Sequence, residues 1–132
     1  MTQDRYDRQR RIDKWRQDAL EASRVLIFGA GALGNEVLKN LALIGAGSIL
    51  LVDFDRIELS NLSRCVLFRD SDVGKPKAEV AARAAEELNP GITVRHMDGD
   101  LFFDVGLGFY RRADLVISGL DNIAARSHVG IS

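Results

Sequence analysis

The sequence predicts an α/β fold in which a doubly wound, mainly parallel sheet carries helices on both faces. Apolar segments with strand character, at residues 24–28, 48–53, 92–97 and 114–120, alternate with segments of helical periodicity. A glycine-rich turn lies directly between the first strand and the first helix. The last of these strands is continuously apolar in its middle, as expected for a parallel strand that is covered on both faces.

The other elements follow from local patterns. Residues 6–22 mix charged, polar and a few apolar side chains, which indicates a charged amphipathic helix. We therefore expect an N-terminal helical arm at residues 1–22 and one nucleotide-binding, Rossmann-like domain at residues 23–132. Helices are predicted at residues 31–44, 77–88, 103–112 and 122–129. The connection at residues 55–76 has no regular pattern and exceeds the usual loop length, which favours a functional loop.

Composition narrows the class of protein. The chain has 132 residues, with 18 basic and 19 acidic side chains, so neither nucleic acid nor a membrane surface is an expected partner. No apolar run reaches the roughly 18 residues of a membrane span, and the polar start lacks a signal-peptide pattern, so we expect a cytoplasmic protein. The single cysteine, Cys65, excludes an internal disulfide and a Cys-x-x-Cys zinc site.

The glycine-rich turn, residues 29–34 (GAGALG), predicts a phosphate-binding site in a Rossmann-like fold. Gly29 allows a tight turn, Gly31 allows the backbone to approach a phosphate, and Gly34 allows the helix to pack closely on the strand. The free N–H groups at the start of the helix then favour an anion. The motif alone could be a bare glycine turn, but its position between a strand and a helix supports the nucleotide interpretation.

An acidic residue ends the second predicted strand. Asp53 lies nineteen residues after Gly34, at the place where this architecture binds a ribose hydroxyl. Both NAD and ATP contain that adenosine half. The motif therefore predicts an adenosine site but leaves hydride transfer and adenylate chemistry open.

The residues in the connection after the second strand favour a nucleotide triphosphate over NAD as the ligand. An Asn61 amide can orient a phosphate or a ribose, an Arg64 guanidinium can bind phosphate oxygens in a bidentate manner, and Lys75 or Lys77 can neutralise a leaving pyrophosphate. Each residue also has a simpler interpretation, because asparagine favours turns and the three cations could be solvated surface charges. Their order in one loop favours the triphosphate site.

Six motifs together give the chain a specific resemblance. They are RYDRQ at residues 5–9, GAGALG at 29–34, DFD at 53–55, NLSR at 61–64, GKPK at 74–77 and LDN at 120–122. In this set the chain resembles the E1-like activating enzymes, a family that includes the ThiF, MoeB and HesA proteins and the ubiquitin-activating enzymes. The resemblance covers essentially the whole chain, as the N-terminal, nucleotide-binding half of the family.

The resemblance implies an activity. It implies ATP-dependent adenylation of the C-terminal glycine carboxylate of a small ubiquitin-like or sulfur-carrier protein, by an enzyme that forms a homodimer. It also implies a nucleotide site made of Gly29, Gly31, Ala32, Gly34, Asp53, Asp55, Ser60, Asn61, Arg64, Lys77, Asp121 and Asn122. The residues that it implies in catalysis are Arg8, Arg64 and Asp121.

Two of these implied roles have a simpler alternative. Asp121 matches the family aspartate near Mg²⁺, a cation that prefers hard oxygen ligands beside substrate phosphates, but it could instead cap the helix predicted after it. Arg8 matches an arginine that reaches into the partner's ATP site in family dimers. Without the resemblance, Arg8 would be one of several solvated arginines near the N-terminus.

The sequence also departs from the family pattern. The second half of the family, with its carrier groove, zinc site and catalytic cysteine, has no counterpart in these 132 residues, so we expect a chain truncated relative to the family. We interpret Cys65, His96 and His128 as structural or surface residues. Two alternatives stay open: a catalytically incomplete nucleotide-binding and dimerisation module, and an NAD-dependent oxidoreductase.

Overall fold

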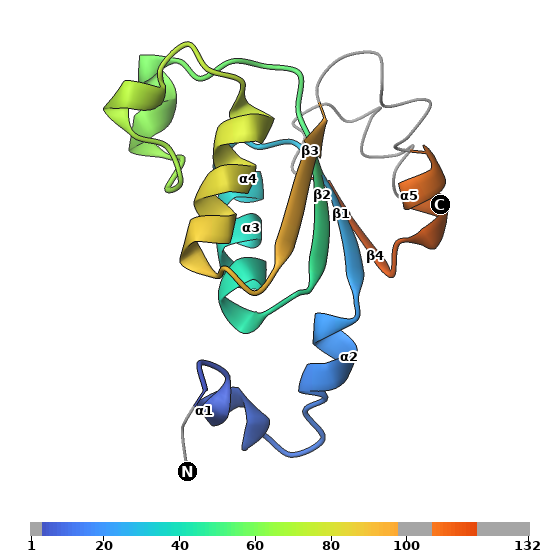
Figure 1. Cartoon of the computed structure of the whole chain (residues 1–132). Helices are drawn as coiled ribbons and strands as arrows, with labels where there is room; N and C mark the ends of the chain where they lie inside the picture. Colours follow the sequence, from blue (N-terminus) through green and yellow to red (C-terminus); the bar gives the residue numbers. More distant parts are fainter. Residues whose placement is uncertain (1–3, 98–106, 119–132) are drawn as a thin grey trace.

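A four-stranded parallel sheet forms the centre of the protein (Figure 1). The structure is a computed structural model, and it describes residues 4–97 and 107–118. The strands are β1 (Arg24–Phe28), β2 (Ser48–Val52), β3 (Thr93–Met97) and β4 (Leu115–Ser118), in the order β3-β2-β1-β4. All three neighbouring pairs are parallel, as the sequence predicts.

Helices cover both faces of the sheet, and this confirms the predicted fold class. The long helices α3 (Ala32–Ile44) and α4 (Lys77–Leu88) contact each other and pack on one face, while α5 (Leu107–Arg112) packs beside β1 on the other (Figure 1). Side chains alternate along β1, because Val25 and Ile27 belong to the core beneath α3 and α4, whereas Leu26 belongs to the opposite core. The sheet is therefore buried on both sides.

The connection between β2 and α4 is folded, although its sequence has no regular pattern. It contains two short 3₁₀ helices, η1 (Leu59–Ser63) and η2 (Asp70–Asp72). Its two ends are joined where Ile57 N–H donates to Lys75 O at 2.9 Å and Gly74 N–H donates to Ile57 O at 2.8 Å. The apolar side chains of Ile57, Leu67 and Phe68 lie buried in the core below α4. Such short pieces leave no periodicity in the sequence.

The N-terminal arm is not the single helix predicted for residues 6–22. It forms two short helices, α1 (Asp7–Arg10) and α2 (Gln17–Glu21), and Lys14 between them has a positive φ of 65°. The break lets both Tyr6 and Gln17 contact Gly45 at the end of α3. A Cβ at Gly45 would lie 2.7 Å from the Tyr6 ring and 2.8 Å from Gln17 Nε2, and the glycine has a φ of +93°.

The remaining differences lie at the ends of elements. The helix predicted for residues 103–112 is observed as α5 from Leu107 onward, and residues 98–106 lie outside the described ranges. The helix predicted for residues 122–129 also lies outside them. None of the helices within the described ranges has the length and apolar character that a membrane span requires.

Candidate nucleotide site

The glycine-rich turn has the geometry that its sequence predicts. Gly29 has a φ of 96° and donates its N–H to Val52 O at 2.7 Å, so the turn is tight and joined to β2. A Cβ at Gly34 would lie only 1.8 Å from Gly29 O, so only glycine lets α3 pack this closely on the turn. A Cβ at Gly31 would meet nothing within 4 Å, and the backbone there borders open space. The approach of a phosphate to Gly31 stays a prediction.

Helix α3 begins without a side-chain cap. Gly31 is its N-cap residue, and no side chain in the described ranges accepts its first N–H groups. Ala32 and Leu33 in the first turn are exposed. Uncapped N–H groups and the positive end of a helix dipole favour a bound anion. This end of α3 lies at the edge where the parallel strands finish (Figure 1).

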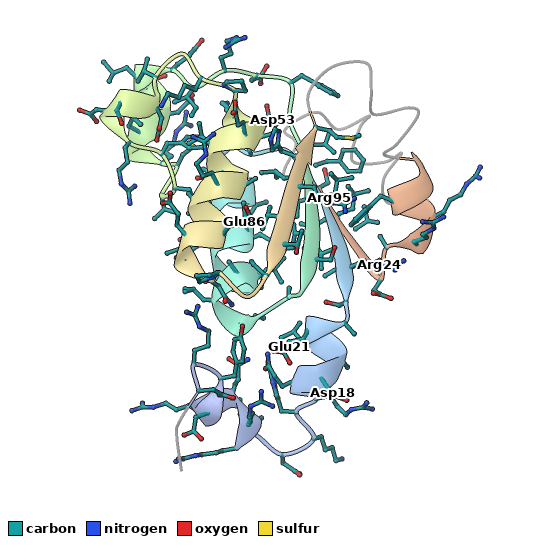
Figure 2. The ribbon with its side chains drawn as sticks, viewed as in Figure 1. Asp18, Glu21, Arg24, Asp53, Glu86 and Arg95 are labelled. Carbon is teal, nitrogen blue, oxygen red and sulfur yellow. The ribbon has the colours of Figure 1, made fainter. Side chains whose placement is uncertain are left out.

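Asp53 lies at the same edge, directly after β2 (Figure 2). Its side chain is buried, with Oδ2 accepting the Ala30 N–H at 2.6 Å and Oδ1 accepting the Asp55 N–H at 2.7 Å. Asp53 thus connects the glycine-rich turn to the start of the crossover connection. A carboxylate can accept about four hydrogen bonds, so the predicted ribose contact is compatible with these two.

A residue that the sequence analysis missed, Asn35, lies behind the turn. It is fully buried, and its Nδ2 donates to Ala30 O at 2.7 Å and to Gly31 O at 3.1 Å. Its Oδ1 accepts the Leu67 N–H at 3.0 Å. A signal was present, because Asn35 lies three and seven residues before the apolar Leu38 and Ala42, on the face of the helix that is buried.

The crossover connection carries the other predicted phosphate ligands. Asn61 caps η1, with its Oδ1 accepting the Glu58 N–H at 2.7 Å, so its simpler interpretation as a turn residue is present in the structure. Ser60 in the same turn is exposed. Arg64 follows η1 and is exposed, and no ion pair to it is found within the described ranges. Lys77 is half-buried and is the first residue of α4.

Three of these charged groups affect the ionisation of Cys65. Burial raises the pKa of the Cys65 thiol, the nearby cations Lys77 and Arg64 lower it, and Asp53 raises it. Such effects fall off with distance, so each of the three groups lies in the neighbourhood of the Cys65 thiol. Cys65 itself is buried in the core, in agreement with its interpretation as a structural residue. His96 is exposed on β3.

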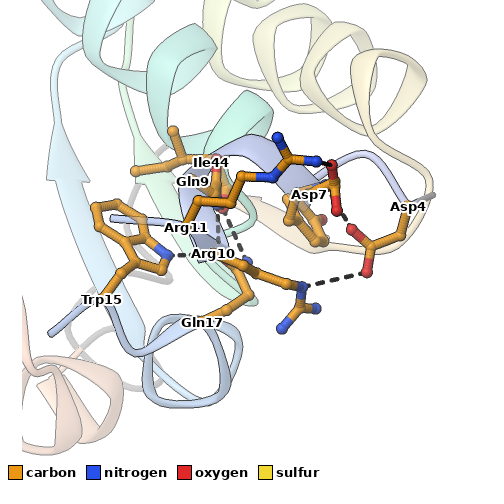
Figure 3. Close-up of polar contacts among 9 residues, drawn as sticks. Asp4, Asp7, Gln9, Arg10, Arg11, Trp15, Gln17 and Ile44 are labelled. Atoms are coloured by element: carbon orange, nitrogen blue, oxygen red, sulfur yellow. Dashed lines mark hydrogen bonds and ion pairs between the residues drawn. The ribbon is translucent and has the colours of Figure 1, made fainter. Parts of the chain in front are cut away.

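Arg8 lies far from this group of residues. The arm that carries it is joined to the opposite end of α3, where Gln9 Nε2 donates to Ile44 O at 2.7 Å and Gln17 Nε2 donates to the same oxygen at 3.0 Å (Figure 3). A helix of this length spans about 20 Å. Exposed Arg8 therefore cannot reach the glycine-rich turn of its own chain, and its predicted role requires a second protomer.

A shallow depression of about 470 Å³ follows the arm. It is lined by Asp4, Arg5, Asp7, Arg8, Gln9 and Arg11. Its charges have both signs and pair locally, as in the Arg11–Asp7 contact of 2.8 Å. The arm that lines it is joined to the end of α3 that lies far from the glycine-rich turn, so this depression is not the nucleotide site.

Asp121 and Asn122, the last predicted site residues, lie outside the described ranges. The predicted Mg²⁺ ligand therefore stays a prediction. Among the residues that the structure describes, no group of three or more His, Cys, Asp and Glu side chains could hold a metal ion. A metal here would depend on substrate phosphates for most of its ligands, as Mg²⁺ commonly does.

The chain is similar to several known proteins. The NEDD8-activating enzyme E1 catalytic subunit of Caenorhabditis elegans is 48% identical over 109 residues, which are 83% of this chain and 25% of the relative. Human ubiquitin-like modifier-activating enzyme 7 is 44% identical over 86% of this chain and 12% of its own length. The crystal structure of E. coli MccB with ATP matches 86% of this chain at 36% identity with a TM-score of 0.75, and the match covers 34% of MccB.

The chain thus spans about a quarter or less of the first two relatives and about a third of MccB. The sequence profile of the ThiF family matches residues 6–130, which include the arm, the glycine-rich turn and the crossover connection. The chain therefore belongs to the ThiF family.

Proposed function

We propose that this chain is the ATP-binding part of an enzyme that adenylates the C-terminal glycine carboxylate of a ubiquitin-like or sulfur-carrier protein. The observation that carries the proposal is the arrangement at one edge of the sheet. There α3 begins without a side-chain cap, the carboxylate of Asp53 is buried, and Arg64, Lys77 and Asp53 all affect the pKa of the Cys65 thiol. The relatives' names support the class of substrate, because they include activating enzymes for NEDD8 and ubiquitin-like modifiers.

The proposed site suits a nucleotide triphosphate as substrate. The N–H groups at the start of α3 would bind phosphate oxygens, and Asp53 would accept a ribose hydroxyl. We assign Ala32, Asp55, Ser60 and Asn61 to the same site, and Arg64 and Lys77 would add positive charge there. A cation is most effective where negative charge grows during the reaction, which here is on the departing pyrophosphate.

The reaction follows from that charge distribution. An oxygen of the carrier's carboxylate attacks the α-phosphorus, and the bond from that phosphorus to the bridging oxygen of pyrophosphate breaks. The products are a carboxyl-adenylate and pyrophosphate. Arg64 and Lys77 stabilise the leaving group, and Mg²⁺, held in part by Asp121, would neutralise phosphate charge.

We further propose a homodimer in which Arg8 completes the site of the partner. The position of the arm supports this role, because Arg8 is exposed and about 20 Å from its own glycine-rich turn. Mixing Arg8→Ala and Arg64→Ala proteins tests it. Half of the dimers would then be mixed with one intact site, so about a quarter of the wild-type activity should return. No recovery would contradict a role across the interface.

Calorimetric titration with ATP and Mg²⁺, and separately with NAD⁺, is the first test of the nucleotide. We expect saturable ATP binding that weakens about tenfold in Arg64→Ala, as for loss of one charge-assisted contact. Arg69→Ala is the matched control, because Arg69 is an exposed arginine of the same connection that donates to Val66 O at 2.9 Å. Binding of NAD⁺ alone would contradict the proposal.

Turnover needs a separate measurement. ATP–pyrophosphate exchange in the presence of candidate carrier proteins with a C-terminal glycine should appear in the wild type and be lost in Arg64→Ala. Nucleotide binding without exchange for any carrier would instead support a binding module without catalysis.

A further inference from the structure

Asn35 connects two segments that are far apart in the sequence. Its Nδ2 donates to Ala30 O at 2.7 Å and to Gly31 O at 3.1 Å in the glycine-rich turn. Its Oδ1 accepts the Leu67 N–H at 3.0 Å, in the connection between β2 and α4. The side chain is completely buried, so water does not compete for these contacts.

Asn35 and Asp53 together hold the glycine-rich turn in place. Asp53 Oδ2 accepts the Ala30 N–H at 2.6 Å while Asn35 Nδ2 donates to the Ala30 carbonyl, so two buried side chains hold this residue from both sides. The orientation of Ala30 and Gly31 determines where the following N–H groups of α3 point. Those groups are the proposed phosphate ligands.

The Leu67 contact also holds the segment that contains Arg64. Leu67 lies three residues after Arg64, and the backbone between them is folded on η1, since Cys65 N–H donates to Asn61 O at 2.9 Å and Phe68 N–H donates to Cys65 O at 3.1 Å. The Leu67 N–H on Asn35 therefore fixes the segment that carries Asn61 and Arg64 relative to the turn.

We propose that Asn35 is a positioning residue, which holds the crossover segment at residues 61–68 against the glycine-rich turn so that both can contact one nucleotide. Only an amide of this size donates to two carbonyls and accepts an N–H at once. Leucine has a similar volume and does neither, whereas aspartate keeps the acceptor and loses the donor. The consequence for nucleotide binding rests on the proposed function, but the connection between the two segments does not.

Hydrogen–deuterium exchange of the whole chain tests that connection. In Asn35→Leu the amides of residues 64–68 should exchange about tenfold faster or more than in the wild type. The control is Leu38→Ala, a fully buried position one turn further along the same helix, with no hydrogen bond to either segment. Equal acceleration in the two variants at matched global stability would mean that Asn35 is only a core residue.

Asn35→Asp covers the case in which Asn35→Leu does not fold. Aspartate can still accept the Leu67 N–H but turns a carboxylate oxygen toward two carbonyls. We expect faster exchange in the crossover segment at neutral pH and recovery toward the wild type in acid, where the protonated carboxyl again donates to Ala30 O. Exchange that is equal to wild type at neutral pH would overturn the proposal.

Titration with ATP and Mg²⁺ separates this proposal from the proposed function. If Asn35 holds Arg64 against the turn, Asn35→Asp should weaken binding in the wild-type background, and the loss in the variant combined with Arg64→Ala should be smaller than the product of the two single losses. Effects that multiply would contradict positioning of Arg64. A wild-type chain that binds no ATP would overturn the proposed function, and the exchange measurements would still decide the role of Asn35.

Discussion

The carboxylate of Asp53 accepts the backbone N–H of Ala30 at 2.6 Å, so the residue that ends β2 holds the turn that ends β1. The same carboxylate accepts the Asp55 N–H at 2.7 Å. The acidic residue that marks an adenosine site in the sequence therefore has a structural task as well. It fixes the turn before a nucleotide arrives, which lowers the entropy that binding must overcome.

Replacing Asp53 should therefore affect both stability and binding. Asp53→Ala removes the acceptor of the buried Ala30 N–H and of the partly buried Asp55 N–H, so we expect the free energy of unfolding to fall by about 3 kcal/mol. Asp55→Ala is the control, because the Asp55 side chain is exposed, and it should change stability by less than about 0.5 kcal/mol. Urea denaturation followed by circular dichroism measures both. Equal effects of the two substitutions would contradict this role for Asp53.

Two glycines of the turn should respond to alanine in different ways. Gly34→Ala places a Cβ 1.8 Å from Gly29 O, so α3 must move away from the turn, and we expect a loss of about 3 kcal/mol or more in stability. Gly31→Ala meets nothing within 4 Å, so the fold should tolerate it with a loss of about 1 kcal/mol or less.

Gly31→Ala, which the fold should tolerate, should nevertheless impair nucleotide binding. The Cβ of Gly31→Ala occupies the open space that a phosphate would enter, so the folded variant should bind ATP at least about tenfold more weakly. Thermal denaturation and calorimetric titration of the two proteins measure the two effects. Wild-type affinity in Gly31→Ala would show that no phosphate approaches this residue.

The sheet could be predicted from the sequence because its signals are local. Apolar strands, a glycine-rich turn and two helices with clear periodicity each identify themselves within a dozen residues. The tight turn at Gly29 and the close packing at Gly34 follow from the same motif, and both are found. The fold class and the glycine geometry are thus consequences of short-range patterns.

The contacts that hold the site could not be predicted in that way. Asn35 and Leu67 are 32 residues apart, and an asparagine in a helix carries no mark of the N–H that it will accept. The arm fails for a related reason. Tyr6 and Gln17 both pack on Gly45, and this tertiary contact overrides the helical propensity of the residues between them. Long-range pairing of buried polar groups decides both cases.

The fluorescence of Trp15, the single tryptophan of the chain, should show whether the arm detaches from the sheet domain. Trp15 Nε1 donates to Gln17 Oε1 at 2.9 Å, and Gln17 is buried and donates to Ile44 O at 3.0 Å (Figure 3). Gln17→Ala removes both contacts, so we expect a red shift of the Trp15 emission and faster proteolysis within the arm, with circular dichroism of the sheet domain unchanged. Asp18→Ala, an exposed change next to it, should leave the emission as in the wild type.

Retention of the wild-type emission in Gln17→Ala would mean that the other contacts of the arm, those of Tyr6 and Gln9, are sufficient to hold it. Tyr6 OH accepts the Asn89 Nδ2 at 2.6 Å, and the same amide donates to Ala42 O at 2.8 Å. If the arm detaches, Arg8 should also no longer complete the site of the partner in the proposed dimer. ATP–pyrophosphate exchange should then fall in Gln17→Ala but not in Asp18→Ala.

Stability should decrease in alkali because of Cys65. Burial raises the pKa of this thiol in the folded protein, and Lys77 and Arg64 offset that effect only in part. Below the ordinary thiol pKa of about 8.5, both states keep the proton and the thiol contributes no pH dependence. Above it, the unfolded thiol ionises first, so the unfolded state binds fewer protons and the free energy of unfolding falls as pH rises, by up to about 1.4 kcal/mol per pH unit. Urea denaturation at about pH 7, 9 and 10 measures how steeply the free energy of unfolding falls with pH. Cys65→Ala is the control, because its cavity changes stability equally at each pH and only the two slopes are compared. A Cys65→Ala protein with the wild-type slope would assign the alkaline loss to other groups.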